Sequence, residues 1–247
     1  MTEPQVLPGA EPLSHAAGPV GVLVIHGFTG SPQSMRPIAN ACIAAGHTVE
    51  MPRLPGHGTT VDDMLTTDWD DWSHHVEQMY LDLAQRCEKV FVTGLSMGGA
   101  LTLWLASRHQ AIAGIAVINS AGEPNAERAA GLAAVVDSGQ ITIDAIGNDI
   151  AKPGVIELAY DRTPLAPLLS LVHAVSDFDL PAIGCPTLIM VSDQDHVVPP
   201  ETARYIADTV GTDATVVHLA NSFHVATLDH DADLINTTII DFIASHS

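Results

Sequence analysis

The chain has 247 residues, 47% of them hydrophobic and 4% aromatic, which suits one large α/β domain, with or without an insertion, around an aliphatic core. Only 9 Lys and Arg face 29 Asp and Glu, so the formal net charge is −20. That balance argues against nucleic acid as a partner and against charge-driven docking on an anionic membrane, because both require clustered positive charge. The acidity fits a high-salt habitat and an ordinary acidic bacterial surface equally well.

The three cysteines, Cys42, Cys87 and Cys185, are an odd number and have no C-x-x-C spacing. They are expected to be reduced, small apolar residues, as is typical of a reducing compartment. The first residues lack the basic and apolar segments of a secretory signal, and no apolar stretch reaches the ~18–20 residues that span a bilayer. We therefore expect a cytoplasmic protein with no integral membrane segment.

Apolar runs and helical periodicities alternate along most of the chain. Residues 20–25 are almost all apolar, as expected of a central strand buried on both faces. Further on, Thr67 is expected to cap a long helix whose apolar stripe includes Trp69 and Trp72, which we interpret as core residues. Strands are also predicted at 47–51, 89–93, 112–118, 187–191 and 214–219, and helices at 35–45, 97–109, 200–210 and 231–244.

This alternation predicts an α/β fold with a mainly parallel sheet of about seven to eight strands, flanked by helices and joined by right-handed crossovers. The alternation lapses between about residues 120 and 183, where Ala-rich, helix-prone sequence is interrupted by glycines and prolines. That stretch is too long for a simple crossover. We therefore predict a core made of residues 1–119 and 184–247, with residues 120–183 inserted as a small cap over the sheet.

The pentapeptide Gly94-Leu95-Ser96-Met97-Gly98 lies between an apolar β-branched run and a helix-forming run. In that context G-x-S-x-G is typical of a nucleophile elbow, a sharp turn that exposes a serine hydroxyl. Gly94 and Gly98 lack the Cβ atoms that would clash in such a turn. The N–H of Met97, in the first turn of the helix, has no intrahelical partner and is free to bind an oxyanion. The alternative interpretation is a glycine-rich turn with an incidental serine.

A serine nucleophile needs a base and an orienting acid, and candidates for both follow Ser96 along the chain. Asp195 lies in a loop after one predicted strand, and His224 lies after the next. The order Ser, Asp, His is that of the α/β-hydrolase fold, and loops after parallel strands share one edge of the sheet. Asp193 is the rival acid, but Asp195 fits the D-x-x-V-P pattern of this fold better. Of the 13 histidines, only His224 combines this order with a loop after a strand.

A second loop, His26-Gly27-Phe28-Thr29-Gly30, matches the H-G-x-x-G pattern that donates one N–H to an oxyanion. We assign that donor to Phe28, alongside the N–H of Met97. His26 is expected to hydrogen-bond the backbone and shape this loop, and not to act as the base. A core histidine with the same backbone bond is the alternative.

Five separated motifs of this chain agree in order and spacing with one family. They are His26-Gly27-Phe28-Thr29-Gly30-Ser31-Pro32, Gly56-His57-Gly58-Thr59, Gly94-Leu95-Ser96-Met97-Gly98-Gly99, Ser192-x-x-Asp195-His196-Val197-Val198-Pro199-Pro200 and Asn221-Ser222-Phe223-His224-Val225-Ala226. From about residue 20 to residue 242, the chain resembles the bacterial monoacylglycerol lipases, a group that also contains carboxylesterases of similar size. The resemblance implies an α/β-hydrolase core with a small cap whose apolar face guides the acyl chain.

The resemblance also implies two ligand-contacting residues in the cap. In the family a cap glutamate contacts the glycerol moiety, and Glu157 lies at the matching position, in Val155-Ile156-Glu157-Leu158-Ala159-Tyr160. Ile146 similarly looks like a residue that lines the acyl tunnel. An exposed helix glutamate is the alternative for Glu157, and a residue of the cap core is the alternative for Ile146.

Together these features predict a serine hydrolase that cleaves the ester bond of monoacylglycerols through an acyl-enzyme on Ser96, giving a free fatty acid and glycerol. We expect no metal and no organic cofactor. The expected partner is the small lipid ester alone, bound by a monomer or weak dimer. The alternatives are a general carboxylesterase or thioesterase for short- to medium-chain acyl esters, a cofactor-free haloperoxidase-like hydrolase, and a catalytically silent binding protein on the same fold. The long cap argues against the haloperoxidase, and the intact Ser96, Asp195 and His224 argue against the silent protein.

Overall fold

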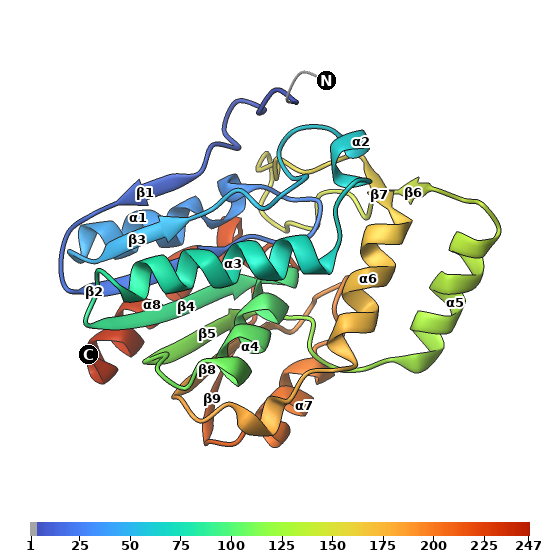
Figure 1. Ribbon diagram of the computed structural model, residues 1–247. Helices are drawn as coiled ribbons and strands as arrows, with labels where there is room; N and C mark the ends of the chain where they lie inside the picture. The colour runs from blue at the N-terminus through green and yellow to red at the C-terminus, as the bar shows by residue number, and fades with distance from the viewer. Residues whose placement is uncertain (1–3) are drawn as a thin grey trace.

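The computed structural model describes residues 4–247, and its main feature is a seven-stranded sheet (Figure 1). Neighbouring strands are all parallel except β1 and β3, which pair antiparallel at one edge. This confirms the predicted α/β fold with a mainly parallel sheet. In spatial order the strands are β1 (Leu13–His15), β3 (Thr48–Met51), β2 (Val20–Ile25), β4 (Lys89–Leu95), β5 (Gly114–Ile118), β8 (Thr187–Ser192) and β9 (Ala214–Leu219).

Helices cover both faces of the sheet, and the side chains of the central strands alternate between the two faces. In β2, Leu23 and Ile25 pack into the core on one face, whereas Val22 and Val24 pack into the core on the other. Burial on both faces explains why this strand is almost entirely apolar. One face carries α1 (Arg36–Ala44) and α8 (Ala232–His246), and the other carries α3 (Trp69–Ala84), α4 (Met97–Arg108) and α7 (Glu201–Thr209).

The long predicted helix is α3, and its apolar stripe is buried as expected. Trp72 is completely buried and Trp69 nearly so, which confirms both as core residues. The helix begins one residue later than predicted, because Asp68 caps it instead of Thr67. The Asp68 carboxylate accepts hydrogen bonds from the first free N–H groups of the helix, whereas the Thr67 hydroxyl donates to a preceding carbonyl.

Between β5 and β8 the chain leaves the sheet, within the stretch predicted to be inserted. It forms α5 (Ala126–Asp137), an antiparallel ribbon of β6 (Thr142–Asp144) and β7 (Arg162–Pro164), and then α6 (Leu165–Val175). The sequence predicts no strands here, because strands of three residues are too short to show a period of two. In Figure 1, α6 lies between α5 and the sheet, and it buries apolar residues against the core while α5 buries none.

The carboxyl ends of the parallel strands meet at one edge of the sheet, where the predicted site residues lie. β2 runs into the His26 loop, β4 into Ser96 and β8 into the Asp195 loop, and the segment after β9 carries His224. Four distant parts of the chain thus reach the same edge. The remaining short helical turns are α2 (Val61–Met64) and the 3-10 turns Pro32–Met35, Leu180–Ala182 and Ala226–Leu228.

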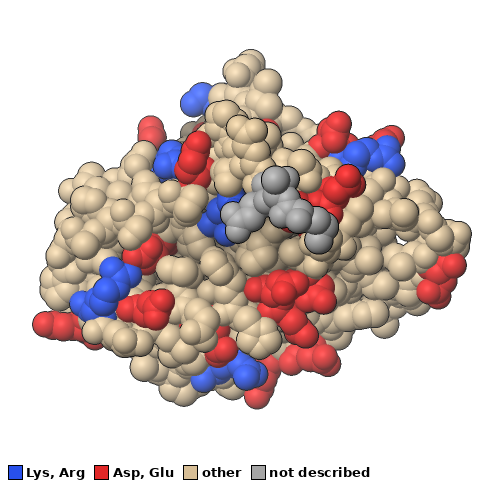
Figure 2. Space-filling model, turned by 45° about the horizontal axis from the view of Figure 1, so that its top comes forward, with Lys and Arg blue, Asp and Glu red and all other residues tan. Residues whose placement is uncertain are grey.

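The surface is acidic, as the composition requires. Figure 2 shows acidic side chains spread over one face, with a group near its centre. Within residues 4–247, no helix combines the length and the apolar character needed to cross a bilayer. Several exposed large apolar side chains belong to residues 120–183 between β5 and β8, which we call the inserted segment, namely Ile141, Ile143, Ile146 and Ile156.

Gly98 lies where the first turn of α4 passes the end of β2. A Cβ at this position would collide with the carbonyl oxygens of Ile25 and His26. Because these are backbone atoms of a buried strand and its loop, they cannot move aside at low cost. We predict that Gly98→Ala lowers the free energy of unfolding by roughly 1–3 kcal/mol, as overpacking does elsewhere, measured by urea denaturation.

Gly131, in the exposed helix α5, is the matched control, because no described atom outside the adjacent residues and the backbone of its own helix lies within 4 Å of the Cβ that alanine would add. Gly131→Ala is expected to leave stability unchanged or to raise it by up to ~1 kcal/mol, since alanine favours a helix. An equal change in the free energy of unfolding of the two variants would contradict the inference that crowding requires glycine at position 98.

Candidate active site

Ser96 lies at the turn between β4 and α4 in a strained backbone conformation, with φ +56° and ψ −116°. The turn is crowded, since a Cβ on Gly94 would collide with the backbone of Gly98. The Ser96 N–H donates to the Ile118 carbonyl at 2.9 Å, which fixes the turn on β5. This strand–turn–helix geometry is that of a nucleophile elbow, and it places Ser96 in the wall of a cavity.

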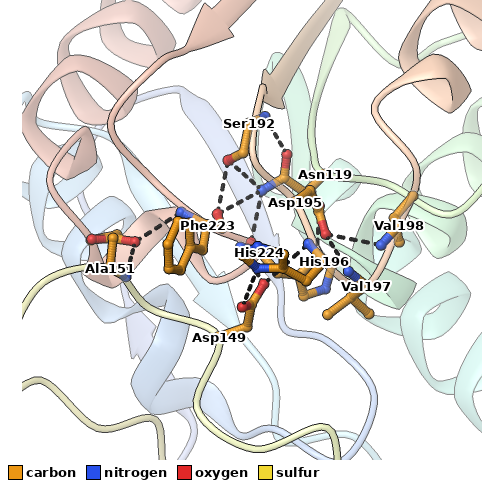
Figure 3. Close-up of polar contacts among 11 residues, drawn as sticks. Asn119, Asp149, Ala151, Ser192, Asp195, His196, Val197, Val198, Phe223 and His224 are labelled. Atoms are coloured by element: carbon orange, nitrogen blue, oxygen red, sulfur yellow. Dashed lines mark hydrogen bonds and ion pairs between the residues drawn. The ribbon is translucent and has the colours of Figure 1, made fainter.

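Asp195 and His224 are joined by a short, buried hydrogen bond. His224 Nδ1–H donates to Asp195 Oδ2 at 2.8 Å. The His224 side chain is 9% exposed and the Asp195 side chain is 2% exposed. Asp195 Oδ1 accepts from the N–H groups of Val197 and Val198 at 2.7 and 2.9 Å (Figure 3). These donors stabilise the buried negative charge. The ring orientation leaves Nε2 of His224 as the nitrogen that can accept a proton.

His224 and Ser96 line the same cavity. No hydrogen bond joins their side chains within residues 4–247, and catalytic contacts of this kind commonly tighten only around a bound substrate.

Asp193, two residues before Asp195, lies away from His224. Its carboxylate accepts from His218 Nδ1–H at 2.7 Å, and 47% of the Asp193 side chain is exposed. Of the two acids that the sequence offers, the structure therefore places Asp195 against His224 and Asp193 on the surface beside β9.

The loop after β2 approaches the elbow closely, since a Cβ on Gly27 would lie 3.4 Å from Ser96 Cβ. Thr29 has a positive φ of 61°, and its hydroxyl donates to the Phe28 carbonyl. The N–H groups of Phe28 and Met97 have no acceptor within residues 4–247. Two free N–H groups near a serine are the arrangement that an oxyanion requires.

His26 supports this loop through hydrogen bonds to backbone on both sides of its ring. Its Nδ1–H donates to the Gly27 carbonyl at 3.0 Å, and its Nε2 accepts the Leu54 N–H at 3.1 Å. His57 packs edge-on against it, is also buried, and has no partner for its Nε2 among the described residues. Burial lowers the pKa of His26 well below its usual value and lowers the pKa of His57 to about 4. Both rings are therefore neutral at pH 7.

The cavity between the strand ends and the inserted segment has a volume of about 290 Å³. Phe28, Glu157 and Ile146 line it together with Ser96 and His224. Much of its wall is apolar, and α6 and the Asp195 loop supply Leu168, Leu171, Val172, Val175 and Val198. Such a wall suits a hydrocarbon chain. Within residues 4–247, no group of three or more His, Cys, Asp or Glu side chains is arranged to hold a metal ion.

Glu157 lies beside the loop of residues 26–30, which follows β2. A Cβ on Gly30 would lie 2.7 Å from Glu157 Oε1, so the carboxylate packs against that loop. Burial raises the pKa of Glu157, while attraction to His224 and the nearby Ser34 hydroxyl act in the opposite direction. A desolvated carboxylate in a cavity wall is a strong acceptor for hydroxyl groups of a ligand.

The main chain around Glu157 is not helical, contrary to the alternative of an exposed helix glutamate. The Gln33 side chain holds it from both sides: its amide donates to the Ile156 carbonyl at 3.1 Å and accepts the Leu158 N–H at 2.9 Å. Ile146, by contrast, is 65% exposed, which places it at the rim of the cavity.

Asn119 is a functional candidate that the sequence pattern did not single out. It follows β5 with a φ of +44° and is almost completely buried. Its amide group donates to the His224 carbonyl at 2.7 Å and accepts the Ser192 N–H at 2.7 Å, so it joins the histidine loop to β8 (Figure 3). An asparagine directly after a buried strand, at the edge that carries Ser96, Asp195 and His224, is the signal that would have found it.

Known proteins resemble this chain over nearly its whole length. A family model described as the alpha/beta hydrolase family matches residues 22–237. The chain is 50% identical over 247 residues to the thermostable monoacylglycerol lipase of Bacillus sp. (strain H-257), covering 98% of this chain and 97% of that protein. It is 26% identical over 242 residues to a carboxylesterase of Bacillus subtilis (strain 168), covering 94% and 96%. A solved structure from a study of LipS and LipT, two metagenome-derived lipolytic enzymes, has a TM-score of 0.93 at 46% identity, covering 98% of this chain and 100% of that one.

The two acids can be separated by amide substitution. Asp195→Asn should lower kcat on the order of 10⁴-fold, because an amide at this position favours the wrong histidine tautomer. Asp193→Asn removes only a surface contact and should change kcat by less than about threefold. Hydrolysis of a p-nitrophenyl ester by both variants gives the ranking, and the reverse order would assign the acid to Asp193.

The buried neutral histidines predict a loss of stability in acid. Burial lowers the pKa of His57 in the folded protein to about 4, compared with an unperturbed value of 6.5. Between these two pH values the unfolded chain binds a proton at His57 that the folded protein does not bind. The free energy of unfolding should therefore fall as the pH drops from 6.5 to about 4. In His57→Asn, whose amide can still donate to the Pro55 carbonyl, the slope should be smaller by up to ~1.4 kcal/mol per pH unit. Urea unfolding at several pH values measures both slopes, and identical slopes would contradict this assignment.

Proposed function

The chain belongs to the alpha/beta hydrolase family, and on that basis we propose that it is a serine ester hydrolase that cleaves monoacylglycerols into a free fatty acid and glycerol. The proposal rests mainly on the cavity. Ser96 and His224 line it together with an apolar wall and the carboxylate of Glu157. An ester of one long acyl chain and a small polyol has the same division into apolar and polar parts. The 50% identity to the Bacillus monoacylglycerol lipase, over nearly the full length of both chains, supports it.

Acylation uses the triad and the two free N–H groups. His224 Nε2 takes the proton of Ser96 as Oγ attacks the ester carbonyl carbon, and Asp195 stabilises the imidazolium that forms. The N–H groups of Phe28 and Met97 bind the oxyanion of the tetrahedral intermediate. As this intermediate collapses, the imidazolium gives its proton to the glycerol oxygen, and the acyl group remains on Ser96.

Deacylation repeats these steps with water. His224 takes a proton from a water molecule as its oxygen attacks the acyl-enzyme, and the Ser96 oxygen then leaves and regains a proton. The fatty acid is released. Each step uses groups of the chain and water, so the proposed mechanism invokes no metal and no organic cofactor.

In this proposal, residues 120–183 form the cap, and two of its features select the substrate. The apolar side of α6 holds the acyl chain, but each buried CH₂ contributes only about 0.8 kcal/mol and selects weakly. Glu157 accepts hydrogen bonds from the two free glycerol hydroxyls, at roughly 1.5–3 kcal/mol for each charge-assisted bond. Ile146, at the rim, contacts the chain as it enters. A di- or triacylglycerol lacks one or both of these hydroxyls and carries further acyl chains that the cavity must fit.

A general carboxylesterase or thioesterase for short- to medium-chain acyl esters is the second candidate. It is favoured by the 26% identity to the Bacillus subtilis carboxylesterase. The same triad would serve it. Glu157 discriminates between the two candidates, because an ester without free hydroxyl groups offers that carboxylate nothing to bind.

We also propose that the protein is cytoplasmic and works as a monomer or weak dimer. Its three cysteines are free, and burial raises the pKa of Cys42 to about 12 and that of Cys185 to about 11. Unreactive free thiols suit a reducing compartment. The groups that the proposed mechanism uses, namely Ser96, Asp195, His224, Phe28 and Met97, all belong to one chain, so the mechanism requires no second copy.

The proposed specificity is tested by Glu157→Gln. This variant should reduce kcat/KM for a monoacylglycerol by roughly 10–100-fold, because it weakens the hydrogen bonds to the glycerol hydroxyls. Hydrolysis of a p-nitrophenyl ester of equal chain length should change little, since that ester has no glycerol. Equal losses on both substrates would mean that Glu157 supports the fold, and no loss on either would leave selectivity to the shape of the cavity.

Ser96→Ala gives the activity that remains in the same assay without the proposed nucleophile. It should lower kcat by a factor on the order of 10⁶, because triad members act as a unit. A folded Ser96→Ala protein with the activity of the unmodified chain would end the hydrolase proposal. Mono-, di- and triacylglycerols, compared with short p-nitrophenyl esters, then rank the two candidate functions.

A further inference from the structure

The main chain of His224 is held on both sides by side chains that lie outside the proposed triad. Its N–H donates to Asp149 Oδ2 at 3.0 Å, and its carbonyl accepts from Asn119 Nδ2 at 2.7 Å. In Figure 3 these two residues lie on opposite sides of His224. Asn119 extends the end of β5, whereas Asp149 comes from the inserted segment. The peptide groups that flank this imidazole are therefore fixed by two unrelated parts of the chain.

Asp149 also contacts the loop that carries the proposed acid. Its Oδ1 accepts from His196 Nδ1–H at 2.7 Å, and its main-chain carbonyl accepts the Val225 N–H at 3.1 Å. The Asp149 side chain is only 13% exposed. One residue of the inserted segment thus touches both the loop of Asp195 and the loop of His224.

The position of Asp149 is set by a second buried carboxylate. Asp229 is 1% exposed and accepts the N–H groups of Ala151 and Lys152, at 2.7 and 2.8 Å, and that of Phe223 at 2.9 Å. Residues 149–152 are consequently bound to residues 223–225 independently of the contact between Asp149 and His224. Asp149 is held where its carboxylate meets the His224 N–H.

We propose that Asp149 is a positioning residue for the reaction, which fixes the main chain of His224 and thereby the distance between its imidazole and Ser96. The proposal rests on the proposed role of His224 as the base. Proton transfer requires the two side chains to come within hydrogen-bond reach, and a misplacement of about 1 Å can cost on the order of 10²-fold in rate. The inserted segment then contributes to the chemical step as well as to substrate fit.

The test compares Asp149→Ala with Asp149→Asn. Alanine removes the acceptor of the His224 N–H, so kcat should fall by roughly 10–100-fold on both a monoacylglycerol and a p-nitrophenyl ester, while KM changes by less than about threefold. Asparagine keeps a carbonyl oxygen that can accept the same N–H, so Asp149→Asn should stay within about fivefold of the unmodified protein. Both values are expressed per active site, counted by complete labelling with a fluorophosphonate.

Asp161→Ala is the matched control. Asp161 is an exposed aspartate of the same segment, and its side chain makes no hydrogen bond within residues 4–247, so kcat should be unchanged. His196→Ala removes the imidazole that donates to Asp149 Oδ1 and leaves the His196 N–H, 3.4 Å from Asp149 Oδ2, in place, so it should lower kcat far less than Asp149→Ala does. If His196→Ala is as damaging as Asp149→Ala, the contact with His196 matters and the proposal is overturned.

Three further outcomes would also overturn it: equal losses in Asp149→Ala and Asp149→Asn, an effect on KM alone, or a lower melting temperature with unchanged kcat per active site. Failure of the proposed function gives a different result. In that case His224→Ala would retain activity whatever the Asp149 variants do, whereas the inference about Asp149 requires His224→Ala to be inactive.

Discussion

The site depends on the close passage of the first turn of α4 across the ends of β2 and β4. Only glycine fits at Gly94 and Gly98, because a Cβ on either would collide with backbone. That crowding holds Ser96 at a positive φ and leaves the Met97 N–H without an acceptor among the described residues. A serine fixed in this way cannot adjust to its partners. The other loops must therefore be brought to it, which explains why so many side chains on this edge bind main-chain atoms.

The acidic composition raises a physical problem at this edge, because the proposed mechanism forms an oxyanion where several carboxylates are buried. The carboxylates of Asp195 and Asp229 are stabilised in the same way. Each accepts hydrogen bonds from two or more backbone N–H groups, which stabilise its negative charge and also fix a loop. Glu157 differs from them. Burial raises its pKa, and no hydrogen bond to its carboxylate is found among residues 4–247, where the nearby Ser34 hydroxyl donates to the Ser31 carbonyl. The carboxylates that shape the loops are thus satisfied by the chain, whereas Glu157 keeps acceptor capacity for a ligand.

The parts of the fold that follow from local pattern were predictable from the sequence. Apolar runs such as β2 show strands buried on both faces, and the chain order of Ser96, Asp195 and His224 acquires meaning once the sheet is parallel. Asn119, Asp149 and Gln33 were not predictable. Each binds main-chain atoms of residues far away in sequence. Asn119 and Asp149 bind the main chain of His224, which lies 105 and 75 positions further on, and Gln33 binds residues 156 and 158, which lie 123 and 125 positions further on. Any short polar side chain on a loop can make such a bond. No periodicity marks these contacts, so only the assembled fold reveals them.

The inserted segment combines two parts of unequal stability. Residues 148–160 are attached to the rest of the site through Asp229, through Gln33, and through Tyr160, whose N–H donates to the Thr29 carbonyl and whose hydroxyl donates to the Gly56 carbonyl. Helix α5, by contrast, buries none of its residues. Local opening costs least where few apolar contacts and few hydrogen bonds are lost, so α5 separates from the body at a lower cost than residues 148–160. Asp149 and Glu157, which line the cavity with His224, thus belong to the part of the segment that is bound more firmly to the rest of the chain.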